Sequence, residues 1–132
     1  MFSLETHDGD ETSISYRIAG DGPPLLLLHG FPQTNMMWHK IAPALAERYT
    51  VVAADLRGYG DSGHPASDAA HAPYSKRAMA ADMAGLMRGL GHHSFMVAGH
   101  DRGGRVAHRL ARDHGDCVTR IAVLDIAPTA AM

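Results

Sequence analysis

The sequence has a single cysteine, Cys117, so no disulfide within the chain can support the fold. Sparse cysteine fits a reducing compartment, and we expect a cytoplasmic protein. Apolar runs such as Leu25–Leu28 are far shorter than the roughly 20 residues that cross a bilayer. The first 20 residues carry four acidic side chains, which is unlike a secretory signal. These features predict neither a membrane-spanning segment nor a signal peptide.

A strong excess of either charge is also missing. The chain has 12 Lys and Arg residues against 14 Asp and Glu residues, which gives a net charge of −2 at pH 7. This balance gives no reason to expect nucleic acid or an anionic membrane as a partner. Hydrophobic residues make up 45% of the chain, enough to build a core, and the length predicts one domain over residues 1–132.

Clustered metal ligands are a third absence. His92 and His93 could form half of a metal site, but no cysteine or acidic cluster lies near them in the sequence. The methionines at positions 79, 83 and 87 recur at helical spacing, which is more typical of a core than of a cofactor site. We therefore expect no metal and no cofactor.

What is present is an alternation of short apolar segments with helical patterns. Residues 2–7 and 12–18 flank a turn-rich tripeptide and predict an antiparallel hairpin. Continuous apolar runs further along are typical of strands buried on both faces of a parallel sheet, and these are Leu25–Leu28, Val51–Ala54 and Ile121–Leu124. The alternation predicts an α/β fold with a mostly parallel sheet and helices on both faces.

Three stretches have apolar side chains at helical spacing, which should face the sheet. In the first crossover helix these are Trp38, Ile41, Ala42, Leu45, Ala46 and Tyr49. In the next, which Gly91 ends, they are Met79, Met83, Leu86, Met87 and Leu90. In the last they are Val106, Ala107, Leu110 and Ala111.

The segment Phe95–Arg105 predicts a strand, a sharp turn and a helix. It fits the elbow pattern Gly-x-nucleophile-x-Gly, with Asp101 at the nucleophile position. Gly99 and Gly103 would let the strand and the helix approach closely, and the N-terminus of the helix would stabilise negative charge on Asp101. A carboxylate nucleophile suits a saturated carbon with a leaving group, because displacement leaves an ester.

With His29-Gly30-Phe31-Pro32 upstream and Asp55–Ser62 between, the chain resembles the α/β-hydrolase superfamily. Within it, the run Gly-His-Asp-Arg-Gly-Gly-Arg is most similar to the fluoroacetate (haloacetate) dehalogenases. Epoxide hydrolases and haloalkane dehalogenases are similar too, but they usually carry Trp where this chain has Arg102. The similarity covers the N-terminal half of that fold. It implies a portion truncated before the cap and the C-terminal strands, with an open sheet edge and exposed apolar helix faces.

The resemblance implies a role for each of five residues. Asp101 is the nucleophile, and Asp125 is the acid that orients the general base. The backbone N–H groups of Phe31 and Arg102 form the oxyanion hole. The guanidinium groups of Arg102 and Arg105 bind the substrate carboxylate, and their spacing of three residues places them at neighbouring positions on one helix face.

Simpler interpretations remain open for these residues. The turn at Phe31 could be merely a tight connection, and Asp125 could cap a helix or loop. The two arginines could form ion pairs with Asp82 or Asp113. The segment Asp55–Ser62 is interpreted as structural, holding loops near the strand ends.

Hydrolysis of the ester requires a general base, normally a histidine. After Asp101 only His108 and His114 remain, and both lie too far along the helix to reach it, so the base is missing from this chain. The leading hypothesis is a hydrolytic dehalogenase of small haloacids. An epoxide hydrolase is the alternative on the same nucleophile, and a non-catalytic remnant or small-carboxylate binder is the alternative of another class. The implied partner is a small molecule, and the resemblance is compatible with a homodimer of the full-length enzyme.

Overall fold

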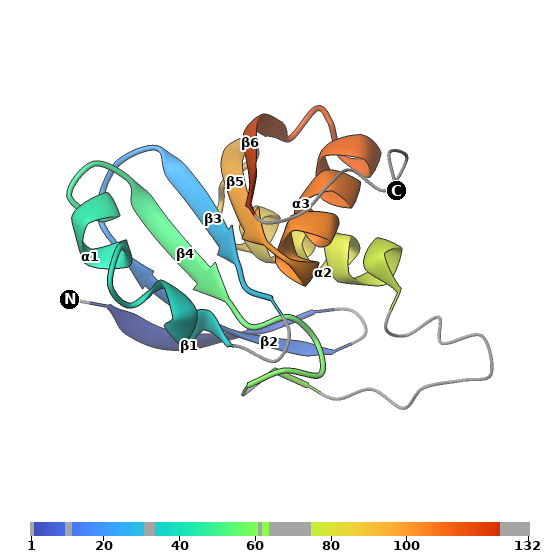
Figure 1. Ribbon diagram of the computed structural model, residues 1–132, viewed down its shortest axis with the longest axis horizontal. Coiled ribbons are helices and arrows are strands. Elements are labelled where there is room, and N and C mark those ends of the chain that lie inside the picture. The colour runs from blue at the N-terminus through green and yellow to red at the C-terminus, as the bar shows by residue number, and fades with distance from the viewer. Residues whose placement is uncertain (1, 10–11, 31–33, 61, 64–74, 125–132) are drawn as a thin grey trace.

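The computed structural model describes residues 2–9, 12–30, 34–60, 62–63 and 75–124, and every structural statement below concerns these residues. Six strands form one sheet in the order β1-β2-β4-β3-β5-β6 (Figure 1). Their bounds are Ser3–Asp8 for β1, Ser13–Ala19 for β2, Pro24–Leu28 for β3, Thr50–Ala54 for β4, Phe95–His100 for β5 and Val118–Leu124 for β6.

The sheet is mixed, and its two parts follow the sequence pattern. β1 and β2 form the predicted antiparallel hairpin, and β2 continues antiparallel onto β4. β3 then pairs in parallel with both β4 and β5, and β5 pairs in parallel with β6. The continuous apolar runs therefore make up the parallel part, as expected for strands that are covered on both faces.

Helices cover both faces of the sheet. The 3-10 helix η1 (Asn35–Trp38) and α1 (Ala42–Leu45) lie on one face, while α2 (Lys76–Gly89) and α3 (Arg102–Asp113) lie on the other (Figure 1). Alternate residues of the central strands separate two cores. Leu26, Leu28, Val52 and Ala54 pack with α2 and α3, whereas Leu27, Val51 and Ala53 pack with Trp38 and Ala42. None of these helices is long and apolar enough to span a membrane.

The first crossover differs from the single helix expected over residues 38–49. It consists of η1 and the four-residue α1, with Pro43 in the first turn of α1. Proline lacks the N–H that a continuous helix would need at this position, so one short helix ends and a second one begins. Trp38 and Ala42 are buried as expected, but Ile41 is 49% exposed and does not face the sheet.

The apolar stripes of the other two helices are confirmed. Met79, Met83, Leu86 and Met87 of α2 are buried, as are Val106, Ala107 and Leu110 of α3. Ser75 caps α2, because its side chain accepts a hydrogen bond from the Ala78 N–H at 3.1 Å. Gly91 follows the end of α2 with φ 86°, the left-handed conformation that glycine adopts readily.

β6 departs from the prediction in length and in burial. It begins three residues earlier than expected, at Val118, and it lies at the edge of the described sheet. Ile121 and Leu124, expected to be buried, are 42% and 46% exposed. An apolar run in the sequence does not distinguish an edge strand from a central one. The predicted exposed apolar surface is therefore present, but it lies on this strand and not on α2 or α3.

Two helical glycines should respond oppositely to alanine. A Cβ at Gly103 would collide with the backbone oxygens of Leu28 and His29, whereas a Cβ at Gly85 would meet nothing within 4 Å. We expect Gly85→Ala to stabilise the natural-length protein by about 0.5–1 kcal/mol, since alanine is the better helix former. We expect Gly103→Ala to destabilise it by several times that amount, on the order of 3 kcal/mol. Chemical denaturation measures both, and equal effects would contradict the close approach at Gly103.

Candidate active site

Asp101 lies at the turn between β5 and α3 and has an unusual backbone conformation. Among the described residues it is the only non-glycine with positive φ, at 55°. Such a conformation costs about 1–3 kcal/mol and is found mainly at functional sites. Its N–H donates to the Leu124 carbonyl at 3.1 Å, and its carbonyl accepts from the N–H groups of Gly104 and Arg105 at 2.9 and 3.2 Å. The backbone of the predicted elbow is thus fixed by β6 on one side and by α3 on the other.

Three glycines make room for this turn. A Cβ at Gly99 would overlap the carbonyl of Gly103, and a Cβ at Gly103 would overlap the end of β3. Gly30 lies against Asp101 itself, because a Cβ there would come within 2.7 Å of Asp101 Cβ. The predicted roles of Gly99 and Gly103 are confirmed, and the turn after β3 touches the elbow directly.

The carboxyl ends of the central strands bring the candidate residues to one edge of the sheet. In the register of the sheet, Leu28 of β3 pairs with Ala54 of β4 and with Gly99 of β5. His29, Asp55 and Asp101 follow these strands, so they share the edge where ligands bind in parallel sheets. Phe31 and Asp125, predicted as an oxyanion-hole residue and as the orienting acid, lie outside the described residues.

His29 is a structural histidine. It is fully buried, and its Nε2 accepts a hydrogen bond from the Leu56 N–H at 3.0 Å. The proton therefore lies on Nδ1, which donates to the Gly30 carbonyl at 3.0 Å. Burial lowers the pKa of His29 below its usual value, while Gly30 and Asp55 act weakly in the opposite sense. Both ring nitrogens are engaged, so His29 is not the general base.

Asp55 accepts hydrogen bonds that fix the loops beside Asp101. Its Oδ1 accepts the Asn35 N–H at 2.7 Å, and its carbonyl accepts the Ser62 hydroxyl at 2.6 Å. The hydroxyl oxygen of Ser62 in turn accepts the N–H of Ser15 at 2.8 Å. These contacts confirm the structural interpretation of this segment.

A buried ion pair joins the same segment to α2. The Arg57 side chain is 1% exposed, and its Nε and Nη2 donate to the two carboxylate oxygens of Asp82, each at 2.6 Å. Arg109 pairs with Asp113 at 2.7 Å on the surface of α3. The two acids that the sequence offered as partners for Arg102 and Arg105 therefore pair with other arginines.

Arg102 and Arg105 lie on the first turn of α3, half-buried, and neither this turn nor the first turn of α2 contains an acid. Arg102 Nη1 donates to the Tyr59 hydroxyl at 2.9 Å. Burial lowers the pKa of Lys76, the first residue of α2, and the positive charges of Arg102 and Arg105 lower it further. Three cations therefore lie near one another beside the elbow. Neither Tyr59 nor Lys76 was predicted as a site residue from the sequence. The only sequence feature that could have indicated one of them is the place of Tyr59 within the glycine-rich segment.

Two histidines follow Asp101 in the sequence. His108 is exposed on α3, about two turns beyond the elbow, and His114 follows the end of that helix. The described residues also contain no group of three or more His, Cys, Asp or Glu side chains that could hold a metal ion.

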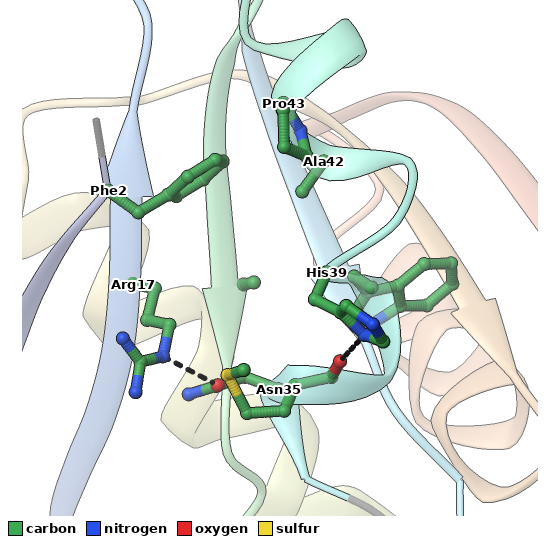
Figure 2. Close-up of a pocket in the computed structure, with 9 residues that line it drawn as sticks. Phe2, Arg17, Asn35, His39, Ala42 and Pro43 are labelled. Carbon is green, nitrogen blue, oxygen red and sulfur yellow. Dashed lines mark hydrogen bonds between the residues drawn. The ribbon is translucent and has the colours of Figure 1, made fainter.

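A cavity of about 150 Å³ lies on the opposite face of the sheet, between β2, β4 and the two short helices (Figure 2). Arg17 Nε donates to Asn35 Oδ1 at 3.2 Å on its floor, and His39 Nδ1 lies 2.8 Å from the Met36 carbonyl oxygen. Apolar side chains, among them Phe2, make up much of its lining. No residue of the elbow lines this cavity, so it is separate from the candidate site.

Residues 23–132 match the family described as the alpha/beta hydrolase fold. The chain belongs to this family. It is 56% identical to a fluoroacetate dehalogenase from a Burkholderia species over 131 residues, which are 99% of this chain and 43% of that protein. It is 47% identical to a soluble epoxide hydrolase from a Corynebacterium species, over 86% of this chain and 38% of that protein.

Solved structures of α/β hydrolases have the same fold. A crystal structure of an α/β hydrolase from Nostoc superposes with a TM-score of 0.96 at 58% identity, over 98% of this chain and 45% of that one. A structure named as an epoxide hydrolase from Pseudomonas aeruginosa gives 0.89 at 47% identity, over 96% and 42%. The chain thus spans less than half the length of these relatives.

The two ion pairs of this α/β hydrolase should differ sharply in their contribution to stability. Asp82→Asn would leave the buried Arg57 charge without its carboxylate, and we expect a loss of about 3–5 kcal/mol in the free energy of unfolding. Asp113→Asn is the matched control on the exposed pair, and its expected loss is much smaller than that of Asp82→Asn, because solvent screens this pair. Denaturant titration of the natural-length protein measures both, and similar losses would contradict the structural role of the buried pair.

As the pH falls, His29 should become protonated less readily in the folded protein than in the unfolded chain. Its folded pKa lies below the ordinary value of about 6.5, so below that pH the unfolded chain binds a proton that the folded chain does not. This histidine therefore lowers stability as the pH decreases through about 6.5, by at most about 1.4 kcal/mol per pH unit. Imidazole NMR should show His29 with its proton on Nδ1 at pH 7.5, and this ring should become protonated only at a lower pH than an ordinary histidine. Protonation of the folded ring near its ordinary pKa would contradict this.

Proposed function

We propose that this chain is the N-terminal portion, over residues 1–132, of a hydrolytic dehalogenase that acts on small haloacids. The observation that carries the proposal is the strained elbow, which presents Asp101 directly beside Arg102 and Arg105. A carboxylate nucleophile with two neighbouring cations suits a substrate that has both a leaving group and an acid group. The identity of 56% to the Burkholderia fluoroacetate dehalogenase supports the same substrate class.

In the first step, Asp101 attacks the carbon that bears the halogen. A bond forms between a carboxylate oxygen and this carbon, the carbon–halogen bond breaks, and the halide leaves with the electron pair. The product is an ester of Asp101. The guanidinium groups of Arg102 and Arg105 hold the substrate carboxylate, which aligns the adjacent carbon with the nucleophile.

In the second step, water attacks the carbonyl carbon of the Asp101 ester. The proposed oxyanion hole consists of the N–H groups of Phe31 and Arg102. The close approach of Gly30, the residue before Phe31, to Asp101 supports this proposal. A base oriented by Asp125 takes one proton from the water. Collapse of the intermediate breaks the bond to the alkoxide, which takes the second proton of that water and leaves as a hydroxy acid. Asp101 is then a carboxylate again, and the base releases its proton to solvent. None of His29, His108 and His114 is assigned as this base. No step requires a cofactor. We place the enzyme in the cytoplasm, and the proposal is compatible with a homodimer of the full-length enzyme.

Epoxide hydrolysis is the second candidate. The Corynebacterium soluble epoxide hydrolase is 47% identical over 86% of this chain, and an aspartate nucleophile opens an epoxide to the same kind of ester. Epoxides carry no carboxylate, however, so the two arginines would have no partner on such a substrate. This difference favours the haloacid.

Intact-mass analysis of the natural-length protein tests the proposal. Quenching during turnover of chloroacetate or fluoroacetate should trap a carboxymethyl group on the peptide that contains Asp101, whereas styrene oxide should leave no adduct. We expect Asp101→Asn to abolish the adduct and to lower turnover by at least about 10³-fold. The control Asp116→Asn, an exposed acid on the loop after α3, should leave both unchanged. An adduct from the epoxide alone would replace the dehalogenase with an epoxide hydrolase, and no adduct from either would favour a non-catalytic binder.

A further inference from the structure

Tyr59 makes a direct contact with one of the two proposed carboxylate-binding arginines. Its hydroxyl oxygen accepts a hydrogen bond from Arg102 Nη1 at 2.9 Å. The two residues are 43 positions apart in the sequence, on the loop after β4 and on the first turn of α3. The contact therefore connects the glycine-rich loop to the elbow through side chains.

The loop holds Tyr59 firmly. The Tyr59 N–H donates to the Leu56 carbonyl at 3.0 Å, and its carbonyl accepts the Ser62 N–H at 3.1 Å. Gly58 and Gly60 on either side have φ of 82° and 52°, and a side chain at Gly60 would strike the Asp55 carboxylate. These contacts fix the backbone on both sides of Tyr59.

The ring is fixed as well. It packs edge-on against the buried His29 imidazole, with 5.1 Å between the ring centroids and 64° between the planes. It also packs against the core that α2 and α3 share. The hydroxyl of Tyr59 is thus held at a defined position relative to α3, and a hydrogen bond to it restricts the guanidinium of Arg102.

Two cations lie near Arg102. Lys76 and Arg105 carry the same charge as Arg102, and like charges repel one another most strongly where burial weakens the screening by water. This repulsion opposes the convergence of the three side chains on one anion, and the hydrogen bond from Arg102 to Tyr59 restrains one of them against it. Anions bind best to groups that already have the right geometry, because less ordering entropy is then lost on binding.

We propose that Tyr59 is a positioning residue that aims the Arg102 guanidinium at the substrate carboxylate and thereby makes the site selective for acids over neutral molecules. The inference rests on the proposed function. In this role Tyr59 acts through Arg102, which donates a hydrogen bond to its hydroxyl oxygen. Its removal therefore acts on the binding of the carboxylate and not on the displacement itself.

Tyr59→Phe in the natural-length protein tests this, since it removes the hydroxyl and retains the ring that packs on His29. With chloroacetate we expect KM to rise about five- to tenfold, with kcat within about twofold of the unchanged protein. With chloroacetamide, the neutral analogue, both constants should stay the same. Tyr49→Phe is the matched control, because Tyr49 packs against the other core on the opposite face of the sheet. An unchanged KM for chloroacetate would overturn the proposal, and so would an equal rise for the amide.

A second measurement separates this inference from the proposed function. The guanidinium N–H signals of Arg102, assigned with Arg102→Lys, should be sharp in the unchanged protein and should broaden in Tyr59→Phe. If they broaden while neither protein turns over haloacids, the positioning role stands and the proposed substrate class is wrong. If they are unchanged in Tyr59→Phe, the positioning role is wrong whatever the enzyme acts on.

Discussion

The backbone of Asp101 is the constraint on which the rest of this site depends. A residue with a side chain adopts positive φ only when its surroundings hold it there, and here hydrogen bonds from β6 and α3 do so. The glycines at positions 30, 99 and 103 make this strained turn possible, since a Cβ at any of them would push β3, β5 or α3 away. The position of Asp101 is therefore a consequence of close backbone packing more than of side-chain contacts.

Around this turn, several buried polar groups have hydrogen-bond or ion-pair partners. Arg57 is neutralised by Asp82, the Asp55 carboxylate accepts a backbone N–H, and both nitrogens of His29 are used. An unpaired group of this kind would cost stability, so each contact holds a loop in place at the edge of the sheet. Beside Asp101, the first turns of α2 and α3 contribute Lys76, Arg102 and Arg105 and contain no acid. This concentration of positive charge supports their proposed role toward an anionic ligand.

The sequence was sufficient where the determinants are local. Gly99, Asp101 and Gly103 lie within five residues, so the chemistry of a single turn predicts the elbow. The continuous apolar runs of the central strands and the stripe of α2 likewise predict the layers. Pro43 shows how one backbone N–H overrides an apolar pattern, since it divides the expected helix. Tyr59 could not be assigned, because no rule of spacing connects it to a side chain 43 residues away.

The hydrogen bond from the Asp101 N–H to the Leu124 carbonyl closes the segment from β5 to β6 on itself. Strand, turn, helix and returning strand form a single parallel unit that contains the hydrogen bonds described for the Asp101 backbone, while the end of β3 packs against it. Such a unit can be inherited or recombined as a block among relatives. Substitutions elsewhere in the sheet can then change what the site binds while the geometry of the Asp101 turn is conserved.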